Sequence, residues 1–152
     1  MTTRLREATD QDRSAVVALW HSGDLTRPWN NPESDFAAAL GNPSSTVLVL
    51  TEGDRVLGTV MTGDDGHRGW LYYLAVHPDH QGEGHGRALV TAAENWLAGR
   101  GVVKVQLMIR EGNPVAGFYA GLGYQEQAVT TWGRRLAEQC VSGRCGPSRP
   151  LR

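Results

Sequence analysis

The fold is decided by one stretch of sequence, Val76-His77-Pro78-Asp79-His80-Gln81-Gly82-Glu83-Gly84-His85-Gly86-Arg87. The apolar run that leads into it, Trp70 to His77, is typical of a strand, and the proline ends that strand because it has no N–H to donate. Apolar residues at helical spacing follow, so we expect a helix from Gly84 or Gly86 to Gly99. The stretch is therefore a strand–turn–helix connection.

The turn in this stretch is suited to holding an anion. Its three glycines alternate along the chain, and glycine lets the backbone approach a ligand closely. The first amides of the following helix have no hydrogen-bond partners within the helix, and the helix dipole adds positive potential there. Sites of this kind most often bind phosphate. A dinucleotide fingerprint would need glycine where Arg87 stands, and a Walker A loop would need lysine and then serine or threonine directly after Gly86.

The chain before this stretch predicts a strand, two helices and a loop. Thr3 to Ala8 has strand character, and Thr9 with Asp12 resembles a capping box that opens an amphipathic helix. Leu25 to Pro32 is bounded by prolines and predicts a loop, and Pro32 to Leu40 predicts a short helix with proline in its favoured first turn.

The other segments complete a mixed-sheet α+β domain. We expect strands at Thr46–Thr51, Arg55–Thr62, Val102–Ile109 and, as a last pair of short strands, Gln125–Arg135, with a helix at Asn113–Ala120. The early hairpins are antiparallel, whereas the strand–helix–strand unit around the turn is a right-handed parallel crossover. We expect one domain over residues 1–136 and a disordered tail over 137–152, where glycine, proline, serine and arginine accumulate.

Composition excludes several classes of protein. A chain of 152 residues with 40% hydrophobic residues suits one globular domain. Its formal net charge of -1 and its mixed charges do not suit a nucleic-acid binder. The apolar runs are too short to cross a bilayer and the start of the chain lacks a signal-peptide pattern, so we expect a cytoplasmic protein without a membrane partner.

The two cysteines, Cys140 and Cys145, do not indicate a site. A structural zinc ion needs four ligands, and a disulfide is not expected in a reducing cytoplasm. We therefore expect no metal.

The turn and the segments around it resemble the GNAT acetyltransferases. Gln81-x-x-Gly84-x-Gly86 is similar to the family signature Q/R-x-x-G-x-G/A. Leu71 to Pro78 looks like the fourth strand of the family. Asn113-Pro-Val-Ala-Gly-Phe-Tyr119-Ala-Gly-Leu-Gly-Tyr124 looks like its "N…FYxxxGF" segment.

The resemblance extends roughly from Thr3 to Arg135. Two loop segments also resemble one subgroup of the family. Asp24 to Asn30 and Asp65 to Gly69 resemble the YpeA-like bacterial members of the family. The family fold is a central, mixed and mostly antiparallel sheet of six to seven strands flanked by helices, with a V-shaped splay between the fourth and fifth strands. The resemblance implies that acetyl-CoA lies in that gap.

The resemblance also implies the residues that bind acetyl-CoA. The backbone of the fourth strand would pair with the pantetheine arm, the amides of the turn would hold the pyrophosphate, and an asparagine would contact the cofactor before the next helix. These residues are Leu74, Ala75, Val76, Gln81, Gly82, Glu83, Gly84, His85, Gly86, Arg87 and Asn113.

The implied reaction is direct attack of an amine on the thioester, without a covalent enzyme intermediate. A backbone N–H near Leu74 or Ala75 would hold the oxyanion. Tyr119 matches the tyrosine that protonates the departing CoA thiolate, which suits a phenol with an ordinary pKa near ~10. The structural alternative for Tyr119 is a core aromatic residue.

The base and the acceptor are less defined. Some relatives use a glutamate in the fifth strand as the general base, but Met108 stands at that position here. The other candidates for the general base are Glu111, Asp64, Asp65 and His67. Each of them can also be interpreted as a solvated turn residue. Arg27 and Arg68 would border the acceptor side and bind an acidic acceptor, or else they are solvated surface residues. Trp20, Trp29 and Trp70 are candidates for lining that side, although the spacing of Trp20 and Trp96 favours the core.

Three functions fit these patterns. The first is an acetyl-CoA-dependent N-acetyltransferase that acts on a small-molecule or peptide amine. The second is a non-catalytic module that senses acetyl-CoA or docks on a partner, and the third is a nucleotide-phosphate protein that shares only the anion-binding turn. A last strand near Thr130 to Arg134 would allow a homodimer.

Overall fold

A five-stranded sheet forms the centre of the computed structural model, which describes residues 2–137. The strands follow one another across the sheet in chain order, as β1 (Thr3–Glu7), β2 (Ser45–Glu52), β3 (Arg55–Asp64), β4 (Gly69–Val76) and β5 (Val105–Leu107). The first four are antiparallel to their neighbours, whereas β5 joins β4 in parallel. The prediction of a mixed, mostly antiparallel sheet is confirmed.

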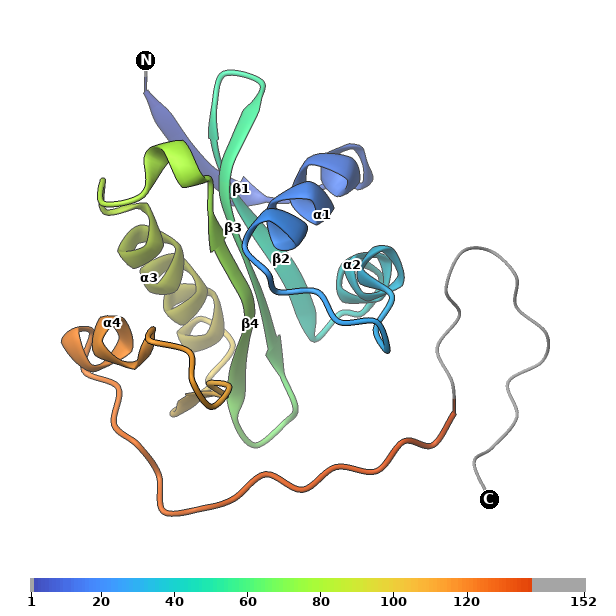
Figure 1. Cartoon of the computed structure of the whole chain (residues 1–152), viewed down its shortest axis with the longest axis vertical. Coiled ribbons are helices and arrows are strands. Elements are labelled where there is room, and N and C mark those ends of the chain that lie inside the picture. The colour runs from blue at the N-terminus through green and yellow to red at the C-terminus, as the bar shows by residue number, and fades with distance from the viewer. Residues whose placement is uncertain (1, 138–152) are drawn as a thin grey trace.

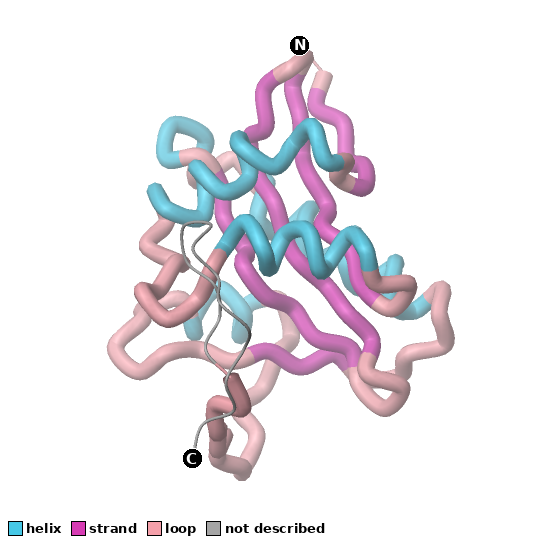
Figure 2. The backbone as a smooth tube through the Cα atoms, turned by 90° about the vertical axis from the view of Figure 1, so that its right-hand side faces the viewer, coloured by secondary structure: helices cyan, strands magenta, loops and turns pink. Residues whose placement is uncertain are grey.

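Helices cover both faces of the sheet (Figure 1). The helices are α1 (Arg13–Ser22), α2 (Pro32–Gly41), α3 (His85–Ala98) and α4 (Ala116–Gly121), with short 3-10 turns η1 (Asp10–Asp12) and η2 (Pro78–His80). α1 and α2 lie on one face, which Figure 2 views from the front, and α3 and α4 lie on the other. The parallel crossover predicted around the central turn is β4–α3–β5.

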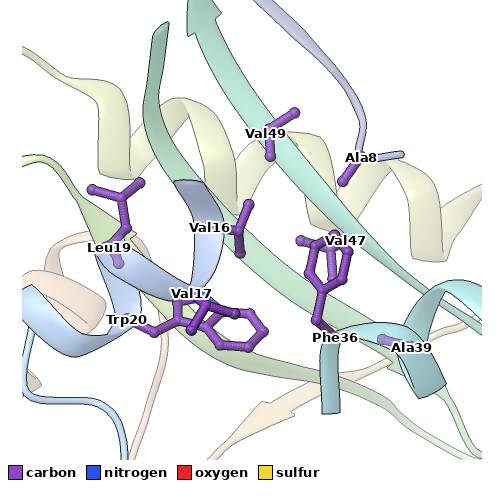
Figure 3. Packing of buried hydrophobic residues seen from close by; sticks show 10 residues of the cluster. Ala8, Val16, Val17, Leu19, Trp20, Phe36, Ala39, Val47 and Val49 are labelled. Carbon is purple, nitrogen blue, oxygen red and sulfur yellow. The ribbon is translucent and has the colours of Figure 1, made fainter. Parts of the chain in front are cut away.

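Two apolar clusters fill the space between the helices and the sheet. On the α1/α2 face, Trp20 and Phe36 pack over the β2 valines (Figure 3), and both aromatic side chains are fully buried. On the α3/α4 face, Leu89 and Leu97 are fully buried against β3 and β4, and Trp96 packs at the margin of this cluster. The core position predicted for Trp20 is confirmed, whereas Trp96 is only partly buried.

The predicted capping box at the first helix is present. The Thr9 amide donates to the Asp12 carboxylate at 2.8 Å, and the Asp12 amide donates to the Thr9 carbonyl at 2.9 Å. The Arg6 guanidinium of β1 donates twice to the same carboxylate, at 2.7 and 2.9 Å. The pKa of Asp12 is lowered, first by these hydrogen bonds from Arg6, while burial acts in the opposite direction. Asp12 therefore joins the first strand to the first helix.

Replacing Asp12 by asparagine is expected to lower the free energy of unfolding by about 1–3 kcal/mol at pH 7, since Arg6 then loses a charged partner. Because the folded-state pKa of Asp12 lies below its unfolded value, this stabilisation is present above about pH 4 and is lost as the pH falls through the folded-state pKa. Urea unfolding at pH 7 and pH 3 measures the difference. Asp10→Asn is the control, because its ion pair with Arg13 is exposed and contributes little. A deficit of Asp12→Asn that is equal at both pH values would contradict this account.

The predicted pair of strands at Gln125–Arg135 is wrong, because this part of the described chain contributes nothing to the sheet. Its two large apolar side chains, Val129 and Trp132, are 75% and 91% exposed and stand three residues apart, so they cannot share one face of a strand. Figure 1 shows the segment running past the end of the sheet. Within residues 2–137 the sheet has five strands instead of six to seven, and a dimer through a strand at Thr130–Arg134 loses its basis.

The fifth strand is shorter than the predicted Val102–Ile109. Val103 and Met108, which flank β5, are 88% and 52% exposed, so apolar character at these positions does not reflect burial in a sheet. Cys140, Cys145 and the predicted disordered tail from residue 138 onward lie outside the described residues. Within residues 2–137, no helix has the length and apolar composition that a membrane crossing requires.

Candidate active site

A β-bulge interrupts the middle of β4. Ala75 pairs with Thr59 and Tyr72 pairs with Met61, so β4 has one more residue than β3 between these two pairs. Tyr73 takes up the extra residue with a φ of 52°, in the left-handed region that aromatic residues rarely adopt. Bulges and strained residues of this kind gather at functional sites, where they redirect the strand.

The bulge coincides with a gap between β4 and β5. β5 pairs with β4 only where Val105–Leu107 lies beside Gly69–Leu71. From Tyr72 to Val76, the β5-facing edge of β4 has no ladder partner in the described part of the chain. Such an edge offers backbone N–H and C=O groups that an extended ligand can pair with as an added strand. This is the splay that was expected between the fourth and fifth strands.

The glycine turn, residues Gln81–Arg87, lies at the open end of this gap. After η2, Gly82 and Gly84 have φ values of 78° and 85°, which glycine adopts without strain. α3 begins at His85, and the first bond of its ladder runs from the Ala88 amide to the Gly84 carbonyl at 3.1 Å. The amides before Ala88 in the turn therefore have no helical acceptor and can donate to an anion.

Gln81 holds the turn onto the strand. Its side-chain amide donates to the Val76 carbonyl at 3.4 Å, which ties the start of the turn to the end of β4. The residues predicted to bind acetyl-CoA from the two elements, Leu74–Val76 and Gln81–Arg87, are thus contiguous in space. On β4, Leu74 and Val76 pack toward the α3 cluster and Ala75 packs toward the α1 cluster.

Gly86 allows α4 to approach this turn. A Cβ added at Gly86 would lie 3.2 Å from the Phe118 ring and 3.9 Å from a Val76 methyl group. A larger residue would therefore push α4 away from the end of β4. This close contact places α4, which carries Tyr119, against the turn and the end of β4.

Tyr119 is buried in an aromatic group. Its residue surface is 8% exposed, and its ring makes edge-to-face contacts with Phe118 and Tyr124, at centroid distances of 5.0 and 5.7 Å. The Tyr124 hydroxyl donates to Glu94 of α3 at 3.0 Å. Burial raises the pKa of Tyr119, so the phenol is protonated at neutral pH.

Asn113 lies before α4, as predicted. Its side-chain oxygen accepts the Val115 amide at 3.1 Å, so the side chain shapes the entry to α4 and keeps its NH₂ group as a donor. Asn113 itself is exposed. It is therefore accessible to a ligand that follows the turn.

The three residues predicted for the acceptor side have different environments. The Arg27 guanidinium donates to the carbonyls of Asp24 and Thr26 at 2.8 and 2.7 Å, so it stabilises its own loop. Arg68 is less constrained, with one hydrogen bond to the His67 carbonyl at 3.1 Å. Trp29 is 50% exposed.

The structure brings two other arginines to Trp29. The Arg110 guanidinium lies 5.8 Å from the Trp29 ring centroid, and Arg135 donates to the Trp29 carbonyl at 2.7 Å. Sequence reasoning missed both, because they follow Trp29 by many residues and no local pattern joins them. These contacts gather positive charge at Trp29.

Asp65 is a poor candidate for the general base. Its carboxylate accepts the amides of His67 and Arg68 and the indole N–H of Trp70, at 2.7–2.9 Å. These hydrogen bonds, that of the Arg68 amide first, lower the pKa of Asp65 to about 2. Asp64 is also engaged, since it accepts the Gly66 amide at 2.7 Å. Both acids shape the turn before β4.

The residues around the bulge are the largest group that sequence reasoning missed. The Tyr73 hydroxyl donates to Asp35 of α2 at 2.9 Å, and its ring stacks on Trp20 of α1 at a centroid distance of 4.0 Å. The sequence feature that could have indicated the bulge is the pair of adjacent tyrosines, Tyr72-Tyr73, which interrupts the alternation of apolar and polar residues along the strand. This group fixes the bulged part of β4 against the helices.

Comparison with known proteins identifies the family of this site. Residues 10–124 match the model of the acetyltransferase (GNAT) family. An acetyltransferase from Pectobacterium atrosepticum is 43% identical over 135 residues, which cover 88% of this chain and 96% of that protein.

Solved structures share the fold. AAC(6')-Iy, in complex with the bisubstrate analogue CoA-S-monomethyl-acetylneamine, superposes with a TM-score of 0.75 at 14% identity, over 89% of this chain and 99% of that one. The ribosomal-protein-S18-alanine N-acetyltransferase from Escherichia coli superposes with a TM-score of 0.68 at 25% identity, over 83% and 79% of the two chains.

Proposed function

The chain belongs to the acetyltransferase (GNAT) family, and we propose that it transfers the acetyl group of acetyl-CoA to a primary amine of a small molecule or peptide. The observation that carries the proposal is the open edge of β4 from Tyr72 to Val76, which leads directly into the glycine turn. One extended ligand with amides at one end and phosphates at the other fits both features. The pantetheine arm and pyrophosphate of acetyl-CoA have this chemistry.

The donor would be held mainly by backbone groups. The β4 backbone from Leu74 to Val76 pairs with the pantetheine amides, and the amides from Gly82 to Arg87 receive the pyrophosphate. Gln81 contributes by fixing the turn on β4, as its hydrogen bond to the Val76 carbonyl supports. The free NH₂ group of Asn113 donates to the donor substrate before α4.

In the proposed reaction, the amine nitrogen forms a bond to the thioester carbonyl carbon. A backbone N–H near Leu74 or Ala75 stabilises the oxyanion of the tetrahedral intermediate. Collapse of the intermediate breaks the C–S bond, and the Tyr119 hydroxyl gives its proton to the departing thiolate. The proton lost by the amine passes to water. The raised pKa of Tyr119 supports this role, because it keeps the acid protonated.

We propose that the acceptor carries a carboxylate and binds near Trp29 and Arg68, with Arg27 shaping the adjoining loop. Arg68→Ala is expected to raise KM for an acidic acceptor about 5- to 10-fold with little change in kcat, because an exposed charge pair contributes about 1 kcal/mol. Arg27→Ala is expected to act through its loop, since the guanidinium holds two carbonyls there. Steady-state kinetics with a charged acceptor and its amide analogue tests this, and equal KM values for wild type and Arg68→Ala would contradict it.

One observation favours a non-catalytic acetyl-CoA sensor as the second candidate function. The position of the fifth-strand glutamate of some relatives is occupied by Met108, which is 52% exposed. Another candidate base, the Asp65 carboxylate, has a pKa lowered to about 2 by the hydrogen bonds it accepts. A sensor would bind acetyl-CoA at the same turn and release no thiol.

Thermal unfolding with ligands tests the donor site. Acetyl-CoA at 100 times its Kd is expected to stabilise the protein by about 2.7 kcal/mol, which corresponds to a rise in Tm of about 5–10 °C for a chain of this size. ATP and NAD at the same concentration are expected to leave Tm unchanged. A rise with ATP or NAD and none with acetyl-CoA would contradict the proposal.

A further inference from the structure

Two histidines and a glutamate converge in the glycine turn. Glu83 Oε2 lies 3.2 Å from His80 Nδ1 and 2.9 Å from His85 Nε2, and one ligand atom from each residue lies within 4.8 Å of the others. The imidazoles are shielded, with 21% and 14% of their side chains exposed, whereas the glutamate side chain is 50% exposed. Both rings therefore point at one carboxylate oxygen that solvent can reach.

The donor spacing is close to that of a tetrahedral metal site. Zinc binds imidazole nitrogen and carboxylate oxygen at about 2.0–2.2 Å, so neighbouring donors in a tetrahedron stand about 3.3–3.5 Å apart. The two distances from Glu83 to the imidazole nitrogens are near this value. A small adjustment of the two imidazoles would bring the distance between the His80 and His85 ligand nitrogens to the same value. An ion at this point would replace the protons that now join the imidazoles to the carboxylate.

The donor types select the class of ion. Two neutral imidazoles and one carboxylate suit zinc and the neighbouring divalent transition metals, whereas calcium and magnesium prefer oxygen ligands. Glu83 already accepts from both imidazoles through one oxygen atom, so its carboxylate is placed to serve as the oxygen ligand.

The backbone presents the three side chains together. His80 ends η2 and His85 begins α3, and the left-handed conformations of Gly82 and Gly84 turn the chain so that both flank Glu83. The spacing His-x-x-Glu-x-His is visible in the sequence. His77 is not part of the group, whose ligand atoms come from His80, Glu83 and His85.

We propose that His80, Glu83 and His85 bind one divalent transition-metal ion of the zinc class, with a fourth position left for water or a phosphate oxygen. This proposal departs from the expectation of no metal, which rested on Cys140 and Cys145 alone. Three protein ligands with an open position are typical of zinc sites that bind an exogenous group.

The ion would be coupled to acetyl-CoA, an effect that rests on the proposed function. The three ligands belong to the turn whose amides receive the pyrophosphate, so an ion there adds positive charge beside the phosphates and cross-links the turn. A shared element of this kind makes binding reciprocal. We expect zinc to tighten acetyl-CoA binding about 5-fold or more, the lower end of typical coupling.

Zinc titration by calorimetry tests the site. The protein is used as a full chain without a histidine tag, treated with chelator, and carries Cys140→Ser and Cys145→Ser so that these thiols cannot bind the ion. We expect one zinc ion per chain with micromolar or tighter affinity. His80→Ala, His85→Ala and Glu83→Gln are each expected to weaken it at least 10-fold.

His67→Ala is the matched control, because it removes an exposed histidine from a different turn, and it is expected to leave zinc affinity unchanged. Glu83→Gln keeps the shape of an exposed side chain, so it reports on the ligand even where a histidine variant is destabilised. Unchanged zinc affinity in Glu83→Gln and in both histidine variants, or no zinc binding by the parent protein, would overturn the proposal.

Acetyl-CoA titration with and without zinc tests the coupling. The parent protein is expected to bind acetyl-CoA more tightly with zinc, and Glu83→Gln is expected to bind it equally in both conditions. Equal affinity in the parent protein despite bound zinc would overturn the coupling. Absence of acetyl-CoA binding in both conditions would instead contradict the proposed function, and the zinc titration would still decide the metal site.

Discussion

Replacing Tyr119 by phenylalanine is expected to lower kcat by about 100-fold or more while acetyl-CoA continues to bind. The substitution removes only the hydroxyl, so the edge-to-face contacts with Phe118 and Tyr124 are retained. Without this acid, the CoA thiolate must leave unprotonated or take a proton from water. Because the lost interaction is made in the transition state, kcat and kcat/KM for acetyl-CoA should fall together.

Tyr124→Phe is the matched control for this prediction. It removes a hydroxyl from the same aromatic group, but that hydroxyl is engaged by Glu94 on α3, to which it donates at 3.0 Å. The control is expected to lose some stability and to keep kcat within about 3-fold, in line with the loss of one hydrogen bond. Equal losses of kcat in Tyr119→Phe and Tyr124→Phe would show that Tyr119 acts only in packing.

The pH dependence gives a second measure of the same role. Burial raises the pKa of Tyr119 above its ordinary value, so its acidic form persists through the neutral and mildly alkaline range. The wild-type kcat is therefore expected to show no alkaline decline from this group below about pH 10. In Tyr119→Phe, any decline of kcat at higher pH that comes from ionisation of Tyr119 should be absent.

Replacing Gly84 by aspartate is expected to weaken acetyl-CoA binding about 100-fold. A carboxylate about 5 Å from a phosphate charge, at an effective dielectric constant of about 20, costs about 3 kcal/mol. The substitution should preserve the fold, because aspartate tolerates the left-handed conformation and a Cβ at Gly84 meets no atom within 4 Å. Calorimetric titration with acetyl-CoA measures the change in Kd.

Gly101→Asp controls for backbone strain and for the added charge. Gly101 has a φ of 84°, close to the 85° of Gly84, and its Cβ position is likewise open, but it follows the C-terminal end of α3. Gly101→Asp should lose more stability, because its charge lies beyond the negative end of α3, whereas only Gly84→Asp should lose affinity. A similar loss of affinity in both variants, or none in Gly84→Asp, would place the pyrophosphate elsewhere.

The parts of the fold that sequence predicted well are those specified by local residues. Thr9 and Asp12 fix the start of the first helix through one capping box, and the glycine turn is specified within a few residues by proline, glycine and helical periodicity. The β2–β3 hairpin likewise follows from short-range turn chemistry. Such signals do not depend on distant contacts.

The parts that sequence missed depend on partners far along the chain. The bulge at Tyr73 is stabilised by Asp35 and Trp20, which lie on two earlier helices, and the strand pattern alone gives no register. The last strands were overpredicted because Val129 and Trp132 have strand propensity but no surface to cover them. The convergence of His80 and His85 on Glu83 likewise depends on the left-handed conformations of Gly82 and Gly84, which the residue pattern alone does not give.

Thiol release from acetyl-CoA over a panel of primary amines, with mass spectrometry of the acceptor, tests the central claim most directly. The account predicts that at least one small-molecule or peptide amine will give acceptor-dependent release of free CoA, with one N-acetyl group gained for each thiol released. Saturable acetyl-CoA binding without acceptor-dependent thiol release from any amine in the panel would contradict catalysis and leave the sensor function in its place.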